Sequence, residues 1–384
     1  MKYFFRIALI ILFAVSLYGC GKTEQKDISD LESKVEFGLV GQKSFQINNT
    51  SDWLMVIPQI FLDSGTQYLS RLDIPNNQIE IYDYDKGNLV NEISFDKEGP
   101  NSIKGSIVGF QVINKDSIFI IDNSSYLVIA NFKSEIIGKY NARKDFTDSP
   151  NLKASVIPAS INSDVISLIN YPIVNPKRMI TIDLNLKDST ISKRNVIPDE
   201  YINGFWSVGD FSWYSFVKVG DTRIFNFPNL DSLYIYEDGD DNSKPFKVYA
   251  GSKAIQHPIK DIVSPEDYIP SEEELERLPF TRPIYARLLY DEYRQVYYRI
   301  IGKPIAEYLL DSNDPIKSRT REYYILVLDH EFNWLGEFDL PSYENMIDID
   351  LTFISKEGIN LQRESTDEDY AVFDVYSIIE NDKK

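Results

Sequence analysis

Hydrophobic and polar residues alternate in short runs along most of the chain, and Asn, Asp, Gly and Pro separate the runs. Residues 78–83 alternate with a period of two, a turn-forming tetrad follows at 85–88, and a second such run covers 89–95. Successive side chains of a strand point to opposite faces, so this pattern predicts a β-hairpin. The chain is therefore expected to be an all-β protein.

The hairpin unit recurs along the sequence, at 126–140, 178–197, 232–250 and 323–340, and a last unit begins at 370. The units are about 50 residues apart, with one longer interval of about 90 residues. Further strands precede the hairpins, for example at 109–113 and 117–122. Four strands in each repeat predict a six-bladed β-propeller. A two-domain β-sandwich is the alternative, because alternation alone does not separate the two folds.

The two ends of the chain are expected to meet in one blade. The last repeat has no room for a fourth strand after Tyr376, and a strand near 44–48 can complete it. Such pairing closes the ring and leaves no open sheet edge. We therefore divide the chain into a signal peptide (1–19), a flexible tether (20–43) and a propeller (44–384).

Residues 1–20 have the pattern of a bacterial lipoprotein signal. Lys2 and Arg6 precede an apolar run at 7–17, and the segment Leu17 to Cys20 is similar to a lipobox. The run is too short to span a bilayer, which needs about 20 apolar residues. We predict lipidation at Cys20, and expect the protein at the outer membrane of a cell envelope, on either its periplasmic or its surface side.

Two alternatives to lipidation stay open: an uncleaved transmembrane anchor, and an ordinary secretory cleavage near Gly19. Cys20 is the only cysteine of the chain and cannot form an internal disulfide, which favours acylation.

The net charge of the chain excludes some classes of binding partner. Removal of residues 1–19 leaves 38 basic and 59 acidic residues, a net charge of −21. Such a chain repels phosphate backbones, so nucleic acid is excluded, and membrane contact is expected through the lipid. With 43% hydrophobic residues the chain can still build a sizeable core.

The second repeat carries a recognisable motif. Residues 95–101 contain Gly99-Pro100-Asn101, and the strands 108–112 and 116–122 follow. This order is similar to the repeat of six-bladed propellers of the NHL and TolB-like type, with Asn101 in place of a second glycine. Together with the lipobox and the segment 290–299, it makes the chain resemble an uncharacterised family of propeller lipoproteins from Bacteroides-type bacteria, domain of unknown function 4221. The resemblance implies a location and a fold, and no activity, substrate or catalytic residue.

The longer interval predicts two insertions, at about 251–285 and 302–321. Strands of a blade alternate in direction, so both insertions are expected on one face of the ring. Ser271 as N-cap and Glu274 three residues later predict a short helix that stops at Pro279. Long loops on a rigid scaffold often bind ligands, although a merely tolerated insertion is the alternative.

Arginine and tyrosine are concentrated beside these insertions. The candidate binding residues are Arg282, Tyr285, Arg287, Tyr293, Arg294 and Arg299. Arginine pairs with carboxylates and tyrosine offers a flat surface with a polar tip, which would suit an acidic peptide or glycan. Alternation along a strand also requires several of them to pack inside the blade.

Other groups give weaker signals. The acidic segment 237–242 lacks the order of a calcium loop, and Asp348 and Asp350 would share one side of a strand. His257 and His330 are the only histidines and have no motif around them. No catalytic residue, metal site or cofactor is predicted.

The sequence therefore favours an envelope binding or interaction module, and more weakly a hydrolase or lyase acting on a glycan or peptide. A sensor or assembly factor of an envelope complex is a further alternative.

Overall fold

The computed structural model describes residues 31–47, 56–99, 102–123, 126–141, 160–162, 165–169, 179–185, 187–188, 190–198, 214–237, 245–255, 271–311, 321–341 and 349–379. Several features named above lie outside these residues: the signal peptide, Cys20, His257, Asp348 and most of the acidic segment 237–242.

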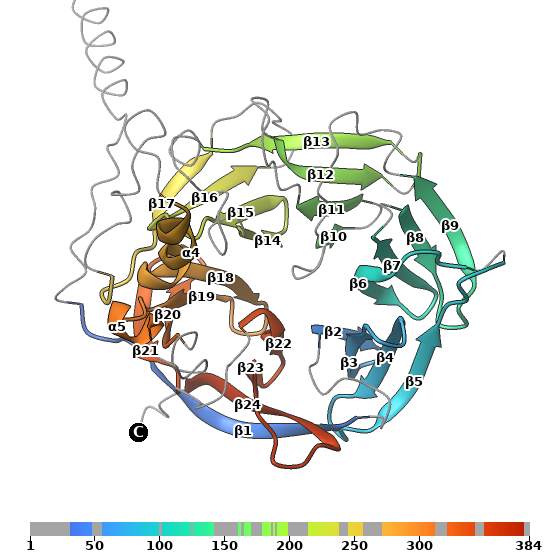
Figure 1. The fold of residues 1–384 in the computed structure, drawn as a ribbon, viewed down its shortest axis with the longest axis horizontal. Helices are drawn as coiled ribbons and strands as arrows, with labels where there is room; N and C mark the ends of the chain where they lie inside the picture. Colours follow the sequence, from blue (N-terminus) through green and yellow to red (C-terminus); the bar gives the residue numbers. More distant parts are fainter. Residues whose placement is uncertain are drawn as a thin grey trace, which may run out of the picture.

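The strands form six four-stranded antiparallel sheets, each one blade of a ring (Figure 1). The first blade contains β2 (Val56–Asp63), β3 (Thr66–Asp73), β4 (Gln78–Asp83) and β5 (Leu89–Ser94). The next contains β6 (Ile107–Asn114), β7 (Ser117–Asp122), β8 (Tyr126–Ala130) and β9 (Ile136–Asn141). It is followed by β10 (Ser160–Asn162), β11 (Val165–Ile169), β12 (Met179–Asn185) and β13 (Ile191–Val196).

The remaining blades follow the same order, with the first strand innermost. One contains β14 (Ser215–Val219), β15 (Thr222–Asn226), β16 (Ser232–Glu237) and β17 (Phe246–Tyr249). The next contains β18 (Ile284–Asp291), β19 (Val296–Gly302), β20 (Tyr323–Asp329) and β21 (Trp334–Asp339). The last combines β22 (Phe353–Ser355), β23 (Gly358–Arg363), β24 (Tyr370–Ile379) and β1 (Glu36–Gln46). The predicted all-β propeller and its hairpins are confirmed.

Apolar clusters hold neighbouring blades together. Ile79 and Ile81 of β4 pack in one cluster with Ile118 and Ile120 of β7, and Tyr297 of β19 packs in a cluster with Ile235 of the preceding blade. A blade is covered on both sides by its neighbours, so its central strands are buried on both faces. This explains why middle strands such as β7 and β20 read as nearly continuous apolar runs.

The strand β1 closes the ring. It pairs antiparallel with β24 from Glu36 opposite Ile379 to Gln46 opposite Tyr370, with a bulge between Leu39 and Gly41. The strand begins eight residues before the predicted start of the propeller, so residues 36–43 are not part of a tether. The polar and glycine-containing sequence there gives no local signal of a strand, and the hydrogen-bond partner of the strand lies at the other end of the chain.

The two predicted insertions lie between β17 and β18 and between β19 and β20. The first contains α4 (Glu272–Thr281), which runs two residues past Pro279, where we expected it to stop. The Thr281 hydroxyl donates to the carbonyl of Arg277 and extends the last turn. The second contains the short helix α5 (Glu307–Leu310). No helix in the described part of the chain has the length and apolar character needed to cross a bilayer.

Candidate functional site

The six arginine and tyrosine candidates do not form one surface. They belong to β18, β19 and the segments that flank them, and adjacent strands of this blade run in opposite directions. The connections that hold α4 and α5 leave one end of the blade, which we call the insertion face. The β18–β19 turn leaves the other end, the turn face, together with the β2–β3 and β22–β23 turns. The candidates are divided between these two faces and the interior.

Arg299 and Tyr285 lie in the interior. Arg299 is 0% exposed, and its guanidinium carbon lies 3.6 Å from the centre of the Tyr285 ring. Its nitrogens donate hydrogen bonds of 2.5–3.0 Å to the side chain of Asn226 and to the carbonyls of Leu230, Asp231 and Ala250. Burial lowers the pKa of Arg299 to about 10, so the group stays charged at neutral pH. This arginine fixes β19 to the preceding blade.

Arg287 and Arg282 also have structural contacts. Arg287 is buried and donates from Nη1 to the carbonyl of Ile349, 2.9 Å away. The carbonyl of Arg282, half-buried beyond the end of α4, accepts a 2.6 Å hydrogen bond from Arg321. Neither arginine contributes its guanidinium group to a cluster with Tyr293 or Arg294.

The two insertions touch each other on the insertion face. Arg277 of α4 forms an ion pair with Asp311, directly after α5, with 2.8 Å between Nη1 and Oδ1. The amide of Ile305 also donates to the carbonyl of Phe280. The hydrogen bond from Arg277 lowers the pKa of Asp311. The prediction that both insertions lie on one face is therefore confirmed.

Tyr293 and Arg294 lie in the β18–β19 turn, which Asp291 organises. One carboxylate oxygen of Asp291 accepts from the backbone amides of Tyr293 and Arg294, and the other lies 3.0 Å from Arg294 Nη1. Gln295 closes the turn with a positive φ of 54°. Asp291 is 0% exposed, whereas Tyr293 is 37% exposed, so the turn has a rigid base and an accessible tip.

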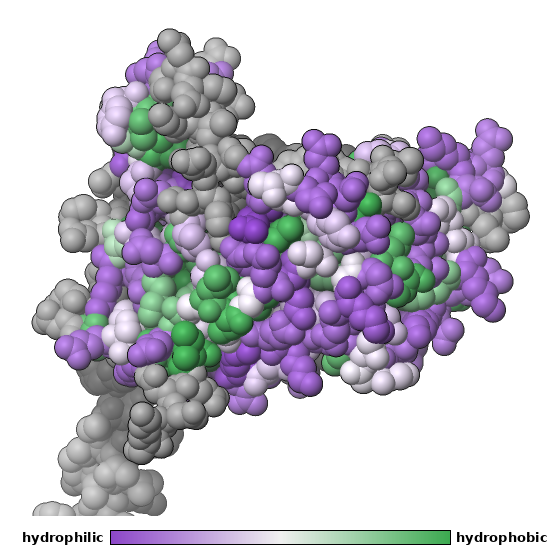
Figure 2. All heavy atoms as spheres, turned by 90° about the horizontal axis from the view of Figure 1, so that it is seen from below, coloured by the Kyte–Doolittle hydropathy of each residue, from purple (hydrophilic) through white to green (hydrophobic). Residues whose placement is uncertain are grey.

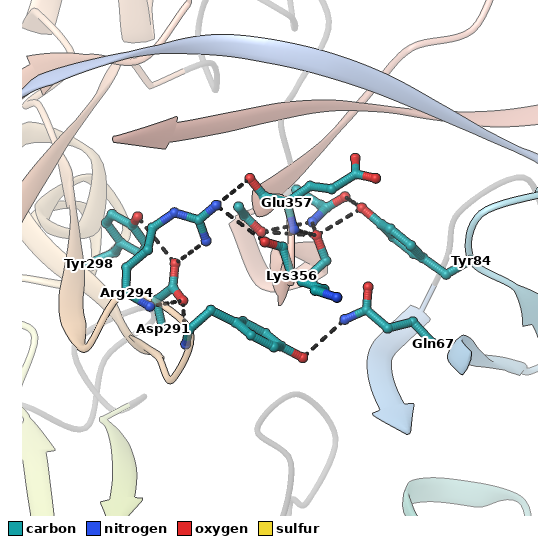
Figure 3. A network of polar contacts seen from close by, with 11 residues as sticks. Gln67, Tyr84, Asp291, Arg294, Tyr298, Lys356 and Glu357 are labelled. Atoms are coloured by element: carbon teal, nitrogen blue, oxygen red, sulfur yellow. Dashed lines mark hydrogen bonds and ion pairs between the residues drawn. The ribbon is translucent and has the colours of Figure 1, made fainter. Parts of the chain in front are cut away.

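Polar contacts connect this turn with two other blades (Figure 3). Arg294 Nη2 donates to the carbonyls of Lys356 and Glu357 in the β22–β23 turn, at 3.2 and 2.8 Å. The Gln67 amide of β3 donates to the Tyr293 hydroxyl over 3.0 Å. We call Gln67, Asp291, Tyr293, Arg294, Lys356 and Glu357 the turn-face cluster.

Lys356 is the charged group of the turn-face cluster that is available to a ligand. Arg294 is paired with Asp291, and Glu357 with Lys43 at 2.7 Å. Lys356 is exposed, and among the described residues its ammonium group has no ion-pair partner. Figure 3 shows its side chain extending toward the Gln67 amide. Gln67 is 6% exposed and its amide already donates to Tyr293, so the cluster can offer the Tyr293 hydroxyl and the Lys356 ammonium group to one ligand.

Burial raises the pKa of Tyr293, while the hydrogen bond from Gln67 lowers it to a smaller extent. The hydroxyl is therefore neutral at physiological pH and can both donate and accept a hydrogen bond. Sequence reasoning missed Gln67 and Lys356, because they lie in blades far from residue 293 along the chain and belong to no motif.

The remaining candidates have other environments. Asp350 lies in the 3₁₀ helix η2 (Ile349–Leu351), so the strand expected at this residue is wrong, and Asp348 lies outside the described residues. His330 lies exposed in the β20–β21 turn, 4.0 Å from Glu331. Within the described ranges, no three His, Cys, Asp or Glu side chains come together as possible metal ligands.

Comparison with known proteins supports the fold. No curated protein matches the sequence significantly. A crystal structure of a DUF4221 family member from Bacteroides vulgatus has a TM-score of 0.72 at 20% identity, covering 91% of this chain and 100% of the other. A candidate exported protein from Bacteroides fragilis has a TM-score of 0.56 at 12% identity, with coverages of 91% and 98%. A family model matches residues 40–339, and the chain therefore belongs to the DUF4221 family, a domain of unknown function.

Proposed function

We propose that this protein is a lipid-anchored binding module of the bacterial cell envelope that binds a carboxylated glycan at the turn-face cluster. The observation that carries the proposal is the convergence of three separate segments: Lys356 is exposed, Tyr293 is 37% exposed, and the buried Gln67 orients the Tyr293 hydroxyl. An ammonium group without an ion-pair partner among the described residues suits a carboxylate, and the neighbouring Tyr293 hydroxyl suits a sugar hydroxyl.

The rigidity of the cluster supports a binding role. Asp291 fixes the β18–β19 turn through its backbone amides, and Arg294 connects that turn to the β22–β23 turn. The polar groups are thus held in place before a ligand arrives, which reduces the entropy lost on binding. The name of the Bacteroides fragilis structural neighbour, a candidate exported protein, and the signal pattern that ends at Cys20 support an envelope location.

Binding can be tested by calorimetric titration of the protein with oligogalacturonate, a neutral oligogalactose and polyglutamate. We expect oligogalacturonate alone to bind, and Lys356→Ala to weaken it about tenfold, since a charge-assisted hydrogen bond contributes roughly 1.4 kcal/mol or more. Lys133→Ala, an exposed lysine of the β8–β9 turn, is the matched control and should leave binding unchanged. Equal affinity for the neutral sugar, or tighter binding of polyglutamate, would contradict the proposed ligand.

The anchor has a separate test. We expect radiolabelled palmitate to be incorporated by the wild-type protein and not by Cys20→Ala. Equal labelling of the two proteins would show that Cys20 is not the acylated residue.

A further inference from the structure

The outer edge of the ring is more apolar at β1 than elsewhere in the described chain. Leu39 and Val40 of β1 are 57% and 50% exposed, and Ile379 at the end of β24 is 40% exposed. We call these three residues the β1 rim patch. Among the side chains that the structure describes, the other outer strands each expose at most one large apolar group: Val90 on β5, Ile137 on β9, Val196 on β13 and Phe246 on β17.

The β-bulge accounts for this concentration. Successive residues of a regular strand point to opposite faces, and a bulge adds one unpaired residue that bends the strand. The shift in register lies between Leu39 and Gly41, so Val40 is the extra residue. Ile379, opposite Glu36 in the same pairing, lies near the same end of β1. Figure 2 views the ring from the side on which β1 and β24 lie, and shows apolar surface among the hydrophilic side chains there.

The position of the β1 rim patch along the chain indicates what it contacts. The described chain begins at Leu31, which lies five positions before the start of β1 and eleven positions after Cys20. A segment of that length spans at most about 40 Å. With Cys20 acylated, the bilayer surface therefore lies within reach of the start of β1. No other outer strand begins so close to the acylated residue along the chain.

We propose, on the basis of the proposed lipid anchor, that the β1 rim patch rests on the bilayer and holds the propeller on its edge. The net charge of −21 opposes attraction to anionic head groups, so the contact relies on apolar side chains and a zwitterionic lipid surface. In this orientation the insertion face and the turn face both point sideways, and the turn-face cluster stays open to solvent.

The experiment uses the acylated full-length protein in phosphatidylcholine vesicles with bromine-labelled acyl chains. An environment-sensitive fluorophore is attached to Val40→Cys in one sample and to Ile137→Cys, on the outer strand of another blade, in the control. We expect at least a twofold stronger quenching at position 40 than at position 137. The additional substitutions Leu39→Asp and Ile379→Asp should reduce the quenching at position 40 to the control value, with an unchanged circular dichroism spectrum.

The outcomes separate the two proposals. Vesicle-bound protein with equal quenching at both positions overturns the patch contact and leaves the anchor intact. If the Cys20→Ala protein binds vesicles as well as the wild type and keeps the difference in quenching, the patch is supported and the anchor is not. Protein that does not bind vesicles at all contradicts both. A dimer of the Cys20→Ala protein that Leu39→Asp dissociates would assign the patch to a second copy of the chain and overturn the lipid contact.

Discussion

Arg299 shows how a single charged side chain can serve as a structural residue in this propeller. Its guanidinium group satisfies acceptors in the preceding blade and stacks on Tyr285, without exposure to solvent. Burial of a charge is unfavourable unless hydrogen bonds compensate it, and here the compensation comes mainly from backbone carbonyls. The concentration of arginine and tyrosine that suggests ligand binding in the sequence is therefore partly a feature of blade packing.

We predict that Arg299→Met lowers the free energy of unfolding by on the order of 3 kcal/mol, because it leaves several buried acceptors without a donor. Arg277→Met is the matched control. It removes an exposed ion pair with Asp311 and should cost less than about 1 kcal/mol. Urea unfolding followed by tryptophan fluorescence measures both values. If the two variants unfold at the same urea concentration, Arg299 does not have the structural role assigned to it.

At the scale of elements, the hairpins could be predicted because their signals are local. Alternation, a turn-forming tetrad and a second alternating run lie within about 20 residues of one another, as in β4 and β5. The full extent of β1 could not be predicted, since Gly38 and Gly41 argue against a strand and the pairing partner is more than 300 residues away. Distant pairing decides the structure of this segment.

The candidate site was predictable only in part, for the same reason. The local concentration of arginine and tyrosine points to Tyr293 and Arg294, and both belong to the turn-face cluster. Gln67 and Lys356 lie beside them only because the ring closes, and no local sequence pattern indicates this closure. Tyr285, Arg287 and Arg299 stand beside them in the sequence, but neighbouring blades cover both faces of their blade, so these three side chains lie in the interior.

At the scale of the whole molecule, tyrosines buried in two of the blades make stability sensitive to high pH. Tyr82, Tyr84, Tyr285 and Tyr298 are at most 2% exposed, and burial raises the pKa of each above the usual value of about 10. Above about pH 10 the unfolded chain releases protons that the folded chain retains. The unfolded state then binds fewer protons, so the free energy of unfolding falls as the pH rises.

We expect this contribution to be fully present below about pH 10, and to be lost by roughly 1.4 kcal/mol for each pH unit and each buried tyrosine above it. Urea midpoints measured in steps from neutral to strongly alkaline pH test the slope. Tyrosinate absorbance should rise together with the loss of ellipticity if ionisation is coupled to unfolding. Tyr298→Phe loses only a 3.4 Å hydrogen bond to Asp291. Its free energy of unfolding should fall less steeply with pH than that of the wild type, by the contribution of one tyrosine. A slope equal to that of the wild type would mean that Tyr298 ionises without unfolding the ring, and that the blades do not hold it neutral.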